Sequence, residues 1–212
     1  MKVRIKWFLG FGALAIIGAL SFVAFALTQT KSPVELADSG SVKGSVESLS
    51  GSGLAEVVRV REFIKTKNIY LTESEVNRLS MAFIDASRKH EVDLWLLLSV
   101  AASESHFRAD AISRVGCIGI MQLKPSTARS LGVDPARLYD PIVNIDTGTR
   151  YLKQLIDKYD DIYLAVAAYN AGPSRVSTTI PQIRETKQYV ARVSNKHNEL
   201  IGTARPNART AE

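Results

Sequence analysis

Apolar and polar residues follow a helical period over most of the chain after residue 54. Apolar side chains recur every three or four positions in 54–67 and again in 141–159, the spacing that places them on one face of an α-helix. No convincing run of strict alternation, the pattern of a half-buried strand, appears, and no internal repeat is present. The pattern therefore predicts an all-α domain.

Capping residues and terminators mark further helices. Thr72 and Glu75 form a capping-box pattern ahead of an amphipathic stretch that ends near His90. Asp93 is a suitable N-cap for the apolar stretch that follows it. A helix that ends at Gly172-Pro173 fits the rule that these residues stop a helix. The helices predicted in this way are 72–90, 94–103, 125–131, 162–169 and 184–200.

The first 30 residues have the pattern of a segment that enters or crosses a membrane. A basic stretch, MKVRIK, precedes an uncharged apolar run over 7–27 that is long enough to span a bilayer as a helix. Two interpretations fit: a signal peptide cleaved near Ala24-Phe25-Ala26, or an uncleaved transmembrane anchor. The run is longer than a usual signal-peptide core, which favours the anchor. Both interpretations place the rest of the chain in the cell envelope, on the periplasmic side of the cytoplasmic membrane.

Residues 31–53 are expected to form a linker. Within 39–53, ten of the fifteen residues are Ser or Gly, and such a stretch cannot bury enough apolar surface to fold. The folded domain is therefore predicted over 54–200, with a flexible tail over 201–212. The chain has a single cysteine, Cys117, so no intrachain disulfide can form.

The formal net charge of +6 does not indicate nucleic-acid binding. Three of the basic residues lie in the first six positions, so half of the excess belongs to the N-terminal segment. No stripe of Lys and Arg interleaved with aromatic residues follows, and we expect no nucleic-acid partner. The histidines His90, His106 and His197 lack metal-ligand spacing. We therefore expect neither a metal nor another cofactor.

A carboxylate ends one of the most apolar stretches of the chain. Glu104 follows Leu97, Val100 and Ala101 by seven, four and three positions, and so shares their helical face. If this face is buried, desolvation raises the pKa of the carboxyl. A carboxyl that is still protonated near neutral pH can act as the general acid in cleavage of a glycosidic bond. Periodicity alone also permits Glu104 to point into water, because this helix is apolar nearly all round.

The loop after Glu104 contains residues that suit an uncharged ligand. Gly116 and Gly119 flank Cys117-Ile118, and glycine permits a backbone to approach another chain closely. Gln122 adds an amide that can both donate and accept hydrogen bonds. An acid, a close-approach loop and a neutral amide suit a polyol such as a glycan.

Three motifs follow one another between residues 104 and 193. The first runs from Glu104-Ser105-His106-Phe107 through Ser113 and Gly116-Cys117-Ile118-Gly119-Ile120-Met121-Gln122-Leu123 to Pro125 and Thr127-Ala128; the second is Ala168-Tyr169-Asn170-Ala171-Gly172-Pro173; the third is Glu185-Thr186 with Tyr189-Val190 and Val193. Together they resemble the Slt-type lytic transglycosylases, and the similar region covers roughly residues 92–193. These are murein-cleaving bacterial enzymes of glycoside hydrolase family 23, which share a lysozyme-like fold with goose-type lysozyme. Cys117 stands where that family usually has alanine; a free cysteine behaves as a small hydrophobe, so this departure changes little.

The resemblance implies a role for each motif residue. Glu104 would be the catalytic acid, protonating the oxygen between N-acetylmuramic acid and the next N-acetylglucosamine. As a carboxylate it would then take the proton of the C6 hydroxyl, which closes onto C1 and leaves a 1,6-anhydro end. Ser113 would bond the acetamido group and Tyr189 the glutamate itself. The substrate-binding positions implied in all are Ser113, Met121, Gln122, Tyr169, Asn170 and Tyr189.

Two other functions remain open. A catalytically idle glycan-binding scaffold of an envelope-spanning machine would use the same fold. A lysozyme-type hydrolase would need a second carboxylate near the scissile bond; Asp110 and Glu185 are the candidates in the motifs, although Glu185 is more simply a helix-start residue. The expected partners are peptidoglycan glycan strands, the cytoplasmic membrane if the N-terminal segment stays uncleaved, and an envelope secretion or conjugation assembly in settings that use one.

Overall fold

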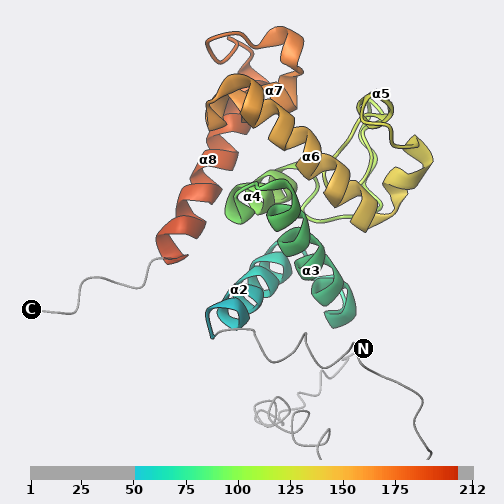
Figure 1. Cartoon of the computed structure of the whole chain (residues 1–212), viewed down its shortest axis with the longest axis vertical. Coiled ribbons are helices and arrows are strands. Elements are labelled where there is room, and N and C mark those ends of the chain that lie inside the picture. Colours follow the sequence, from blue (N-terminus) through green and yellow to red (C-terminus); the bar gives the residue numbers. More distant parts are fainter. Residues whose placement is uncertain (1–50, 205–212) are drawn as a thin grey trace, which may run out of the picture. The chain divides into compact units, whose positions relative to one another are not determined.

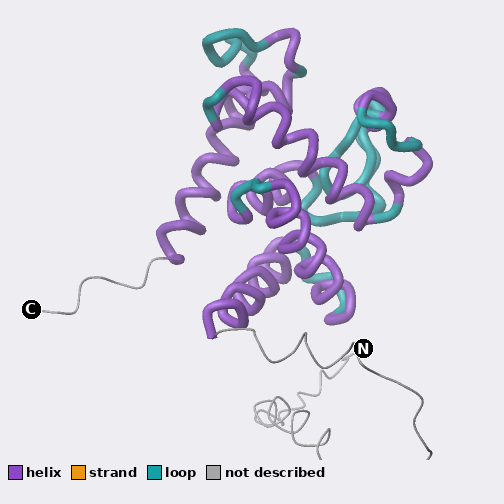
Figure 2. The backbone as a smooth tube through the Cα atoms, viewed as in Figure 1, coloured by secondary structure: helices purple, strands orange, loops and turns teal. Residues whose placement is uncertain are grey.

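Helices make up the regular secondary structure of the computed structural model, which describes residues 51–204 (Figures 1 and 2). No strand occurs among these residues, so the predicted all-α class is confirmed. In chain order the elements are α2 (Gly51–Lys67), α3 (Glu73–His90), α4 (Leu94–Glu104), α5 (Pro125–Ser130), the 3-10 helix η1 (Pro135–Tyr139), α6 (Pro141–Tyr159), α7 (Ile162–Ala171), the 3-10 helix η2 (Pro173–Arg175) and α8 (Arg184–Ala204).

Every helix predicted from the sequence is present, and the limits of the folded domain differ slightly from the prediction at both its ends. Helix α2 begins at Gly51, inside the stretch expected to be linker, and α8 continues to Ala204, past the expected end at residue 200. The predicted membrane segment over 1–30, the linker as far as residue 50 and the tail beyond residue 204 lie outside the described residues. Within 51–204, no helix combines the length and the apolar character that crossing a membrane requires.

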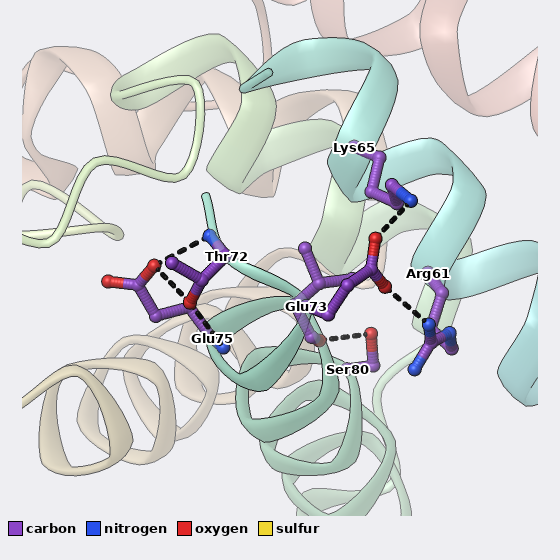
Figure 3. Close-up of polar contacts among 7 residues, drawn as sticks. Arg61, Lys65, Thr72, Glu73, Glu75 and Ser80 are labelled. Atoms are coloured by element: carbon purple, nitrogen blue, oxygen red, sulfur yellow. Dashed lines mark hydrogen bonds and ion pairs between the residues drawn. The ribbon is translucent and has the colours of Figure 1, made fainter. Parts of the chain in front are cut away.

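Two caps identified in the sequence fix the starts of α3 and α4. The Glu75 backbone N–H donates to Thr72 Oγ1 over 3.3 Å, and the Thr72 backbone N–H donates to Glu75 Oε2 over 2.7 Å, which completes the capping box (Figure 3). The Asp93 carboxylate accepts from the Leu96 backbone N–H over 2.7 Å. Both caps satisfy donors that a helix start leaves unpaired.

Helix α4 lies at the centre of the described part of the chain (Figure 1). From Leu94 to Ala102 every residue except Trp95 is buried. Helices α3 and α8 both pack against it. A helix that is apolar on all sides needs such enclosure, and it carries its last residue, Glu104, to the edge of the core.

Helices α2 and α3 pack through apolar side chains and are joined at the surface by an acidic residue. Val60 and Ile64 of α2 are fully buried in the core. At the rim, Glu73 of α3 pairs with both Arg61, over 2.8 Å, and Lys65 of α2 (Figure 3). These pairs are exposed, so apolar burial rather than charge holds the two helices together.

Helix α6 packs against the loop that precedes α5. Asn144, Thr147, Gly148 and Thr149 of this helix are all buried, and Asn144 and Gly148 contact the loop. A Cβ atom added at Gly148 would lie 2.6 Å from the Cβ of Met121. The absence of a side chain at Gly148 is therefore what lets Met121, and the loop that carries it, lie directly on α6.

We expect Gly148→Ala to lower the free energy of unfolding by about 1–3 kcal/mol, because the added methyl group overpacks the contact with Met121. Gly202→Ala is the matched control: it also lies in a helix, α8, but its added Cβ meets nothing within 4 Å. The control should be neutral or slightly stabilising, since alanine is the better helix former. Urea unfolding followed by circular dichroism measures both, and equal stabilities would contradict the packing argument.

Candidate active site

Glu104 is the last residue of α4, and the chain turns sharply after it. The Ser105 backbone N–H donates to the carbonyl of Ala101 over 3.1 Å, which closes the helix. The buried Ser105 hydroxyl donates to the Ile120 carbonyl over 2.8 Å. This second bond ties the end of α4 to the loop that follows, so Glu104 and the loop are held in one arrangement.

The carboxyl of Glu104 has a single hydrogen-bond partner among the described residues. Tyr189 of α8 donates its hydroxyl to Glu104 Oε1 over 2.6 Å. Tyr189 itself is only 2% exposed, so its ring is fixed by packing. The bond joins α4 to α8 at the point where the two helices meet.

Burial dominates the electrostatics of Glu104. Desolvation raises the pKa of its carboxyl from 4.5 to about 7, and the nearby charge of Glu185 acts in the same direction. The Tyr189 hydrogen bond and the positive charge of Arg192 oppose this rise. The carboxyl therefore exists in both protonation states near neutral pH, which suits a group that must first donate and then accept a proton.

The loop over 105–124 is folded on itself by short backbone contacts. It is the long teal segment between α4 and α5 (Figure 2). The Ser113 backbone N–H donates to the Cys117 carbonyl, and the Cys117 N–H donates back to Ser113 Oγ, both over 2.9 Å. Gly116 adopts a φ of 79° within this tight ring, a conformation that glycine adopts without steric cost.

A buried amide on α6 fastens this loop to the helical core. Asn144 accepts a hydrogen bond from the Met121 backbone N–H over 2.7 Å. Its amide nitrogen donates to the carbonyls of Ile118 and Leu138 over 2.9 and 3.0 Å. A Cβ at Gly119 would lie 2.4 Å from that nitrogen, so only glycine leaves room for the amide. Sequence reasoning missed Asn144 as a support of the site.

Two predicted site residues also brace the loop. Tyr169 of α7 donates its hydroxyl to the Met121 carbonyl over 2.8 Å. Gln122 donates its amide hydrogens to the carbonyls of Ala111 and Gly119 over 3.1 and 2.9 Å. Both hydrogens are occupied, so the amide oxygen of Gln122 is the atom left to meet a ligand.

Glu104 lines a cavity of about 360 Å³. Four of the predicted substrate-binding residues line the same cavity: Ser113, Gln122, Tyr169 and Asn170. The Asn170 amide oxygen accepts from Thr186 Oγ1 over 3.0 Å, which leaves its amide nitrogen to donate to a ligand. The cavity thus combines one largely desolvated acid with neutral hydrogen-bonding groups.

Met121 and Tyr189 do not line the cavity. Met121 is fully buried, with its side chain against Gly148 of α6. Tyr189 reaches the site only through its bond to Glu104. Both side chains therefore contact other residues of the protein, Gly148 and Glu104 respectively, and neither faces the cavity.

Several residues of the cavity wall were not among the predicted substrate-binding residues. They are Val115, Cys117, Leu123, Lys124, Thr127, Tyr151, Gly172, Pro173 and Glu185. Most lie in or beside the three motifs, but a motif does not state which of its side chains share a face. Glu185 lies in the first turn of α8, as the helix-start interpretation predicted, and also lines the cavity.

The histidines of the described domain are engaged in acid contacts or lie apart. His90 is 2.8 Å from Asp146, and His197 is 2.9 Å from the capping residue Asp93. Within residues 51–204, no group of three or more His, Cys, Asp or Glu side chains is arranged to hold a metal ion.

Comparison with known proteins finds one family over the region that carries the site. The family model for the transglycosylase SLT domain matches residues 81–191. The transglycosylase of Enterobacteria phage PRD1 is 36% identical over 121 residues, which are 57% of this chain and 43% of the phage protein. Membrane-bound lytic murein transglycosylase C of Shigella sonnei (strain Ss046) is 41% identical over 108 residues, 43% of this chain and 30% of that protein. The matches thus span less than half the length of these relatives.

Solved structures show the same fold. The lytic transglycosylase Slt of Pseudomonas aeruginosa, solved as an inactive glutamate-to-glutamine mutant, superimposes with a TM-score of 0.51 at 25% identity, over 72% of this chain and 31% of that chain. The 70 kDa soluble lytic transglycosylase of Escherichia coli gives a TM-score of 0.53 at 22% identity, over 74% and 32%. The predicted lysozyme-like helical fold is confirmed by these neighbours.

The raised pKa of Glu104 predicts a pH dependence of stability. Between pH 4.5 and about 7, the folded chain keeps a proton on Glu104 that the unfolded chain has released. The stabilisation of the folded state by this bound proton is therefore complete below pH 4.5 and is lost as the pH rises through about 7. The loss amounts to about 3 kcal/mol. Between pH ~4 and pH ~8, the wild type should therefore lose about 3 kcal/mol more stability than Glu104→Gln, whose amide does not titrate.

Urea unfolding across this pH range measures the difference. Glu185→Gln is the control, because Glu185 is exposed and its removal should leave a profile close to that of the wild type. Parallel profiles for the wild type and Glu104→Gln would show that Glu104 is not desolvated.

Proposed function

This chain belongs to the transglycosylase SLT domain family, and from that premise we propose that its helical domain is a peptidoglycan lytic transglycosylase. It cleaves the β-1,4 bond between N-acetylmuramic acid and N-acetylglucosamine without water. The observation that carries this proposal is the Glu104 carboxyl, which lines the cavity and has a pKa of about 7. A carboxyl with this pKa is protonated often enough to act as the acid.

In the first step, Glu104 donates its proton to the oxygen that links C1 of N-acetylmuramic acid to O4 of N-acetylglucosamine. The C1–O4 bond breaks, the leaving sugar keeps the proton as its 4-hydroxyl, and positive charge develops at C1. Glu104 is now a carboxylate, and the hydrogen bond from Tyr189 over 2.6 Å stabilises this form.

In the second step, the Glu104 carboxylate takes the proton of the C6 hydroxyl on the same muramic acid. The C6 oxygen closes onto C1 and gives the 1,6-anhydro product, and Glu104 returns to its protonated form. The C6 hydroxyl is part of the reacting sugar, so its effective concentration is high and it outcompetes water. One carboxyl performs both proton transfers, which a pKa near neutrality favours.

We assign the neutral side chains of the cavity to substrate binding. The Gln122 amide oxygen and the Asn170 amide nitrogen are the atoms that the internal bonds leave available. Ser113 keeps its hydroxyl hydrogen for the acetamido oxygen, because its oxygen accepts from Cys117. Tyr169 and Met121 hold the loop in place, and Tyr189 positions Glu104.

A lysozyme-type hydrolase is the second candidate, and Glu185 is the observation that favours it. Its carboxylate lines the cavity with that of Glu104, and hydrolysis requires a second carboxylate to activate water or to attack C1. Glu185 is exposed at the start of α8, whereas the groups deeper in the site are neutral. The glycan-binding scaffold is the third candidate, and it predicts binding without any turnover.

The cellular setting extends the proposal. Relatives named membrane-bound lytic murein transglycosylases support an envelope location. We propose that the apolar run over 7–27 is an uncleaved anchor, that residues 31–50 are a tether, and that the domain acts on peptidoglycan from the periplasmic side. An envelope secretion or conjugation assembly is the partner that would need such local cleavage of the wall.

The reaction products test the function. The proposal predicts that digestion of purified murein yields muropeptides ending in 1,6-anhydro-N-acetylmuramic acid, lighter by one water than hydrolytic products. Mass spectrometry after digestion in ¹⁸O-labelled water should show no incorporated label. Reducing ends that carry the label would instead identify a hydrolase.

Two glutamine variants separate the carboxylates. Glu104→Gln should retain binding to murein but lose turnover by at least about 1000-fold, because an amide cannot donate the proton. Glu185→Gln should keep the anhydro products and most of the rate. Loss of activity in both variants, with labelled products in the wild type, would favour hydrolysis; normal turnover by Glu104→Gln would refute the assignment of the acid.

Tyr189→Phe tests how the acid is tuned. The variant removes a hydrogen bond that lowers the pKa of Glu104. The alkaline limb of kcat/KM, which follows loss of the Glu104 proton in the free enzyme, should therefore move to higher pH. A profile that falls at the same pH in the variant and the wild type would show that Glu104 does not control the limb.

A further inference from the structure

A second cavity, of about 290 Å³, lies between the end of α2 and the turn that follows α4. We call it the basic pocket. Its lining residues are Lys67, Asn68, Ile69, Tyr70, His106 and Arg108. None of them lines the cavity of Glu104, and none carries a negative charge.

The turn after Glu104 supplies two lining residues of the basic pocket, His106 and Arg108. His106 and Phe107 both adopt left-handed φ values, 54° and 61°, which cost about 1–3 kcal/mol each for residues other than glycine. Phe107 is fully buried, edge-on to Phe63 of α2 at 5.9 Å and to Phe83 of α3 at 5.6 Å. This packing stabilises the strained turn and leaves His106 and Arg108, on either side of Phe107, exposed at the basic pocket.

The cations of the basic pocket are not neutralised by the protein. Arg61 and Lys65 of α2 both pair with Glu73 (Figure 3). Lys67, two residues further along, forms no ion pair with any carboxylate of the described residues, and neither does Arg108. The Lys67 ammonium instead lies 5.2 Å from the centre of the Phe63 ring.

Positive charge continues from the basic pocket along α8. Lys196 is partly buried, and desolvation is the largest cause that lowers its pKa. The positive charges of Lys67 and Arg192 lower it further, and the weaker effect of Glu199 raises it. Arg192 lies 5.8 Å from the centre of the Tyr189 ring and its charge reaches Glu104. The basic pocket and the catalytic carboxyl are therefore linked by a run of cations that repel one another.

The basic pocket also exposes apolar surface. Tyr70 is 90% exposed and Ile69 is 77% exposed, the two highest values among the large apolar side chains of the described residues. The Asn68 side chain accepts from the Tyr70 backbone N–H over 3.2 Å and shapes this turn. Two large apolar side chains beside unpaired cations suit a ligand that carries both carboxylates and aliphatic groups.

We propose that the basic pocket binds the free carboxylates of the peptide that peptidoglycan carries on its muramic acid residues. This inference rests on the proposed function, because it takes the ligand from the same polymer. The peptide supplies both kinds of group that the pocket would contact, carboxylates for Lys67 and Arg108 and aliphatic side chains for Tyr70 and Ile69. The pocket thereby makes the enzyme prefer glycan strands that bear peptides.

Anionic lipid is a less suitable occupant. The pocket lies at the Lys67 end of α2, whereas residues 1–50, which contain the predicted anchor, join at the Gly51 end. The 17 residues of α2 span about 25 Å. Lys67 of the pocket and Arg192 both act electrostatically on Lys196, and the charge of Arg192 also reaches the catalytic carboxyl.

The test uses the double variant Lys67→Gln/Arg108→Gln in the full chain, solubilised in detergent. On peptide-bearing glycan strands, KM should rise about five- to tenfold with kcat unchanged, and the salt dependence of KM seen in the wild type should weaken. On the same strands after enzymatic removal of the peptides, KM should not change. Arg137→Gln/Lys158→Gln removes equal charge from exposed sites outside the basic pocket and is the matched control.

A binding measurement separates this inference from the proposed function. Calorimetry with the free tetrapeptide should detect binding to Glu104→Gln and none when Lys67→Gln/Arg108→Gln is added. If the wild type cleaves neither kind of strand, the proposed function fails while the peptide measurement still decides the pocket. A tetrapeptide that binds the double variant equally well, or the same rise in KM on both substrates, would overturn the inference. So would binding of short-chain phosphatidylglycerol in place of the tetrapeptide, which would assign the pocket to the membrane.

Discussion

The desolvation of one carboxyl is the constraint on which the rest of the site depends. Helix α4 is buried almost all round, and it ends on Glu104 at the edge of the core. The carboxyl finds one compensating hydrogen bond, from a tyrosine that is itself buried. One neutral donor is not enough to restore the solvation of a carboxylate, so the pKa rises to about 7. The chemistry proposed here needs that value.

The surrounding fold keeps this arrangement rigid. The loop over 105–124 contains little regular structure, yet it forms much of the cavity wall. Asn144 of α6 holds it through two hydrogen bonds, to Met121 and Ile118, and a third bond joins Asn144 to Leu138 of η1. Gly119 and Gly148 leave room for these close contacts. A buried amide with all these partners specifies one loop conformation, because a shifted loop would leave polar groups unsatisfied. Neutral binding groups on a rigid frame suit an uncharged sugar.

The sequence predicted the helices well because their limits depend on local interactions. Thr72 with Glu75 and Asp93 act as caps within three residues of their partners. Helical spacing made Glu104 a candidate but left open whether it points into water, and the resemblance of the motifs implied its role as the acid. The motifs suggested Gln122 and Asn170 but could not reveal that internal bonds occupy the Gln122 donors and the Asn170 oxygen.

What the sequence could not predict depends on contacts between distant segments. The resemblance implied that Met121 binds substrate, but its side chain packs on Gly148 of α6, which is distant in the sequence. No role at the site was predicted for Asn144, because its three partners lie in other segments: Met121 and Ile118 in the loop over 105–124, and Leu138 in η1. The basic pocket joins α2 to the turn after α4, and only the folded chain reveals that Lys67 and Arg108 share it.

Direct titration of the Glu104 carboxyl tests the central claim. ¹³C NMR of glutamate-labelled protein, with Glu104→Gln used to assign the signal, should give a midpoint of about 7. A midpoint at the ordinary value of 4.5 would contradict the account.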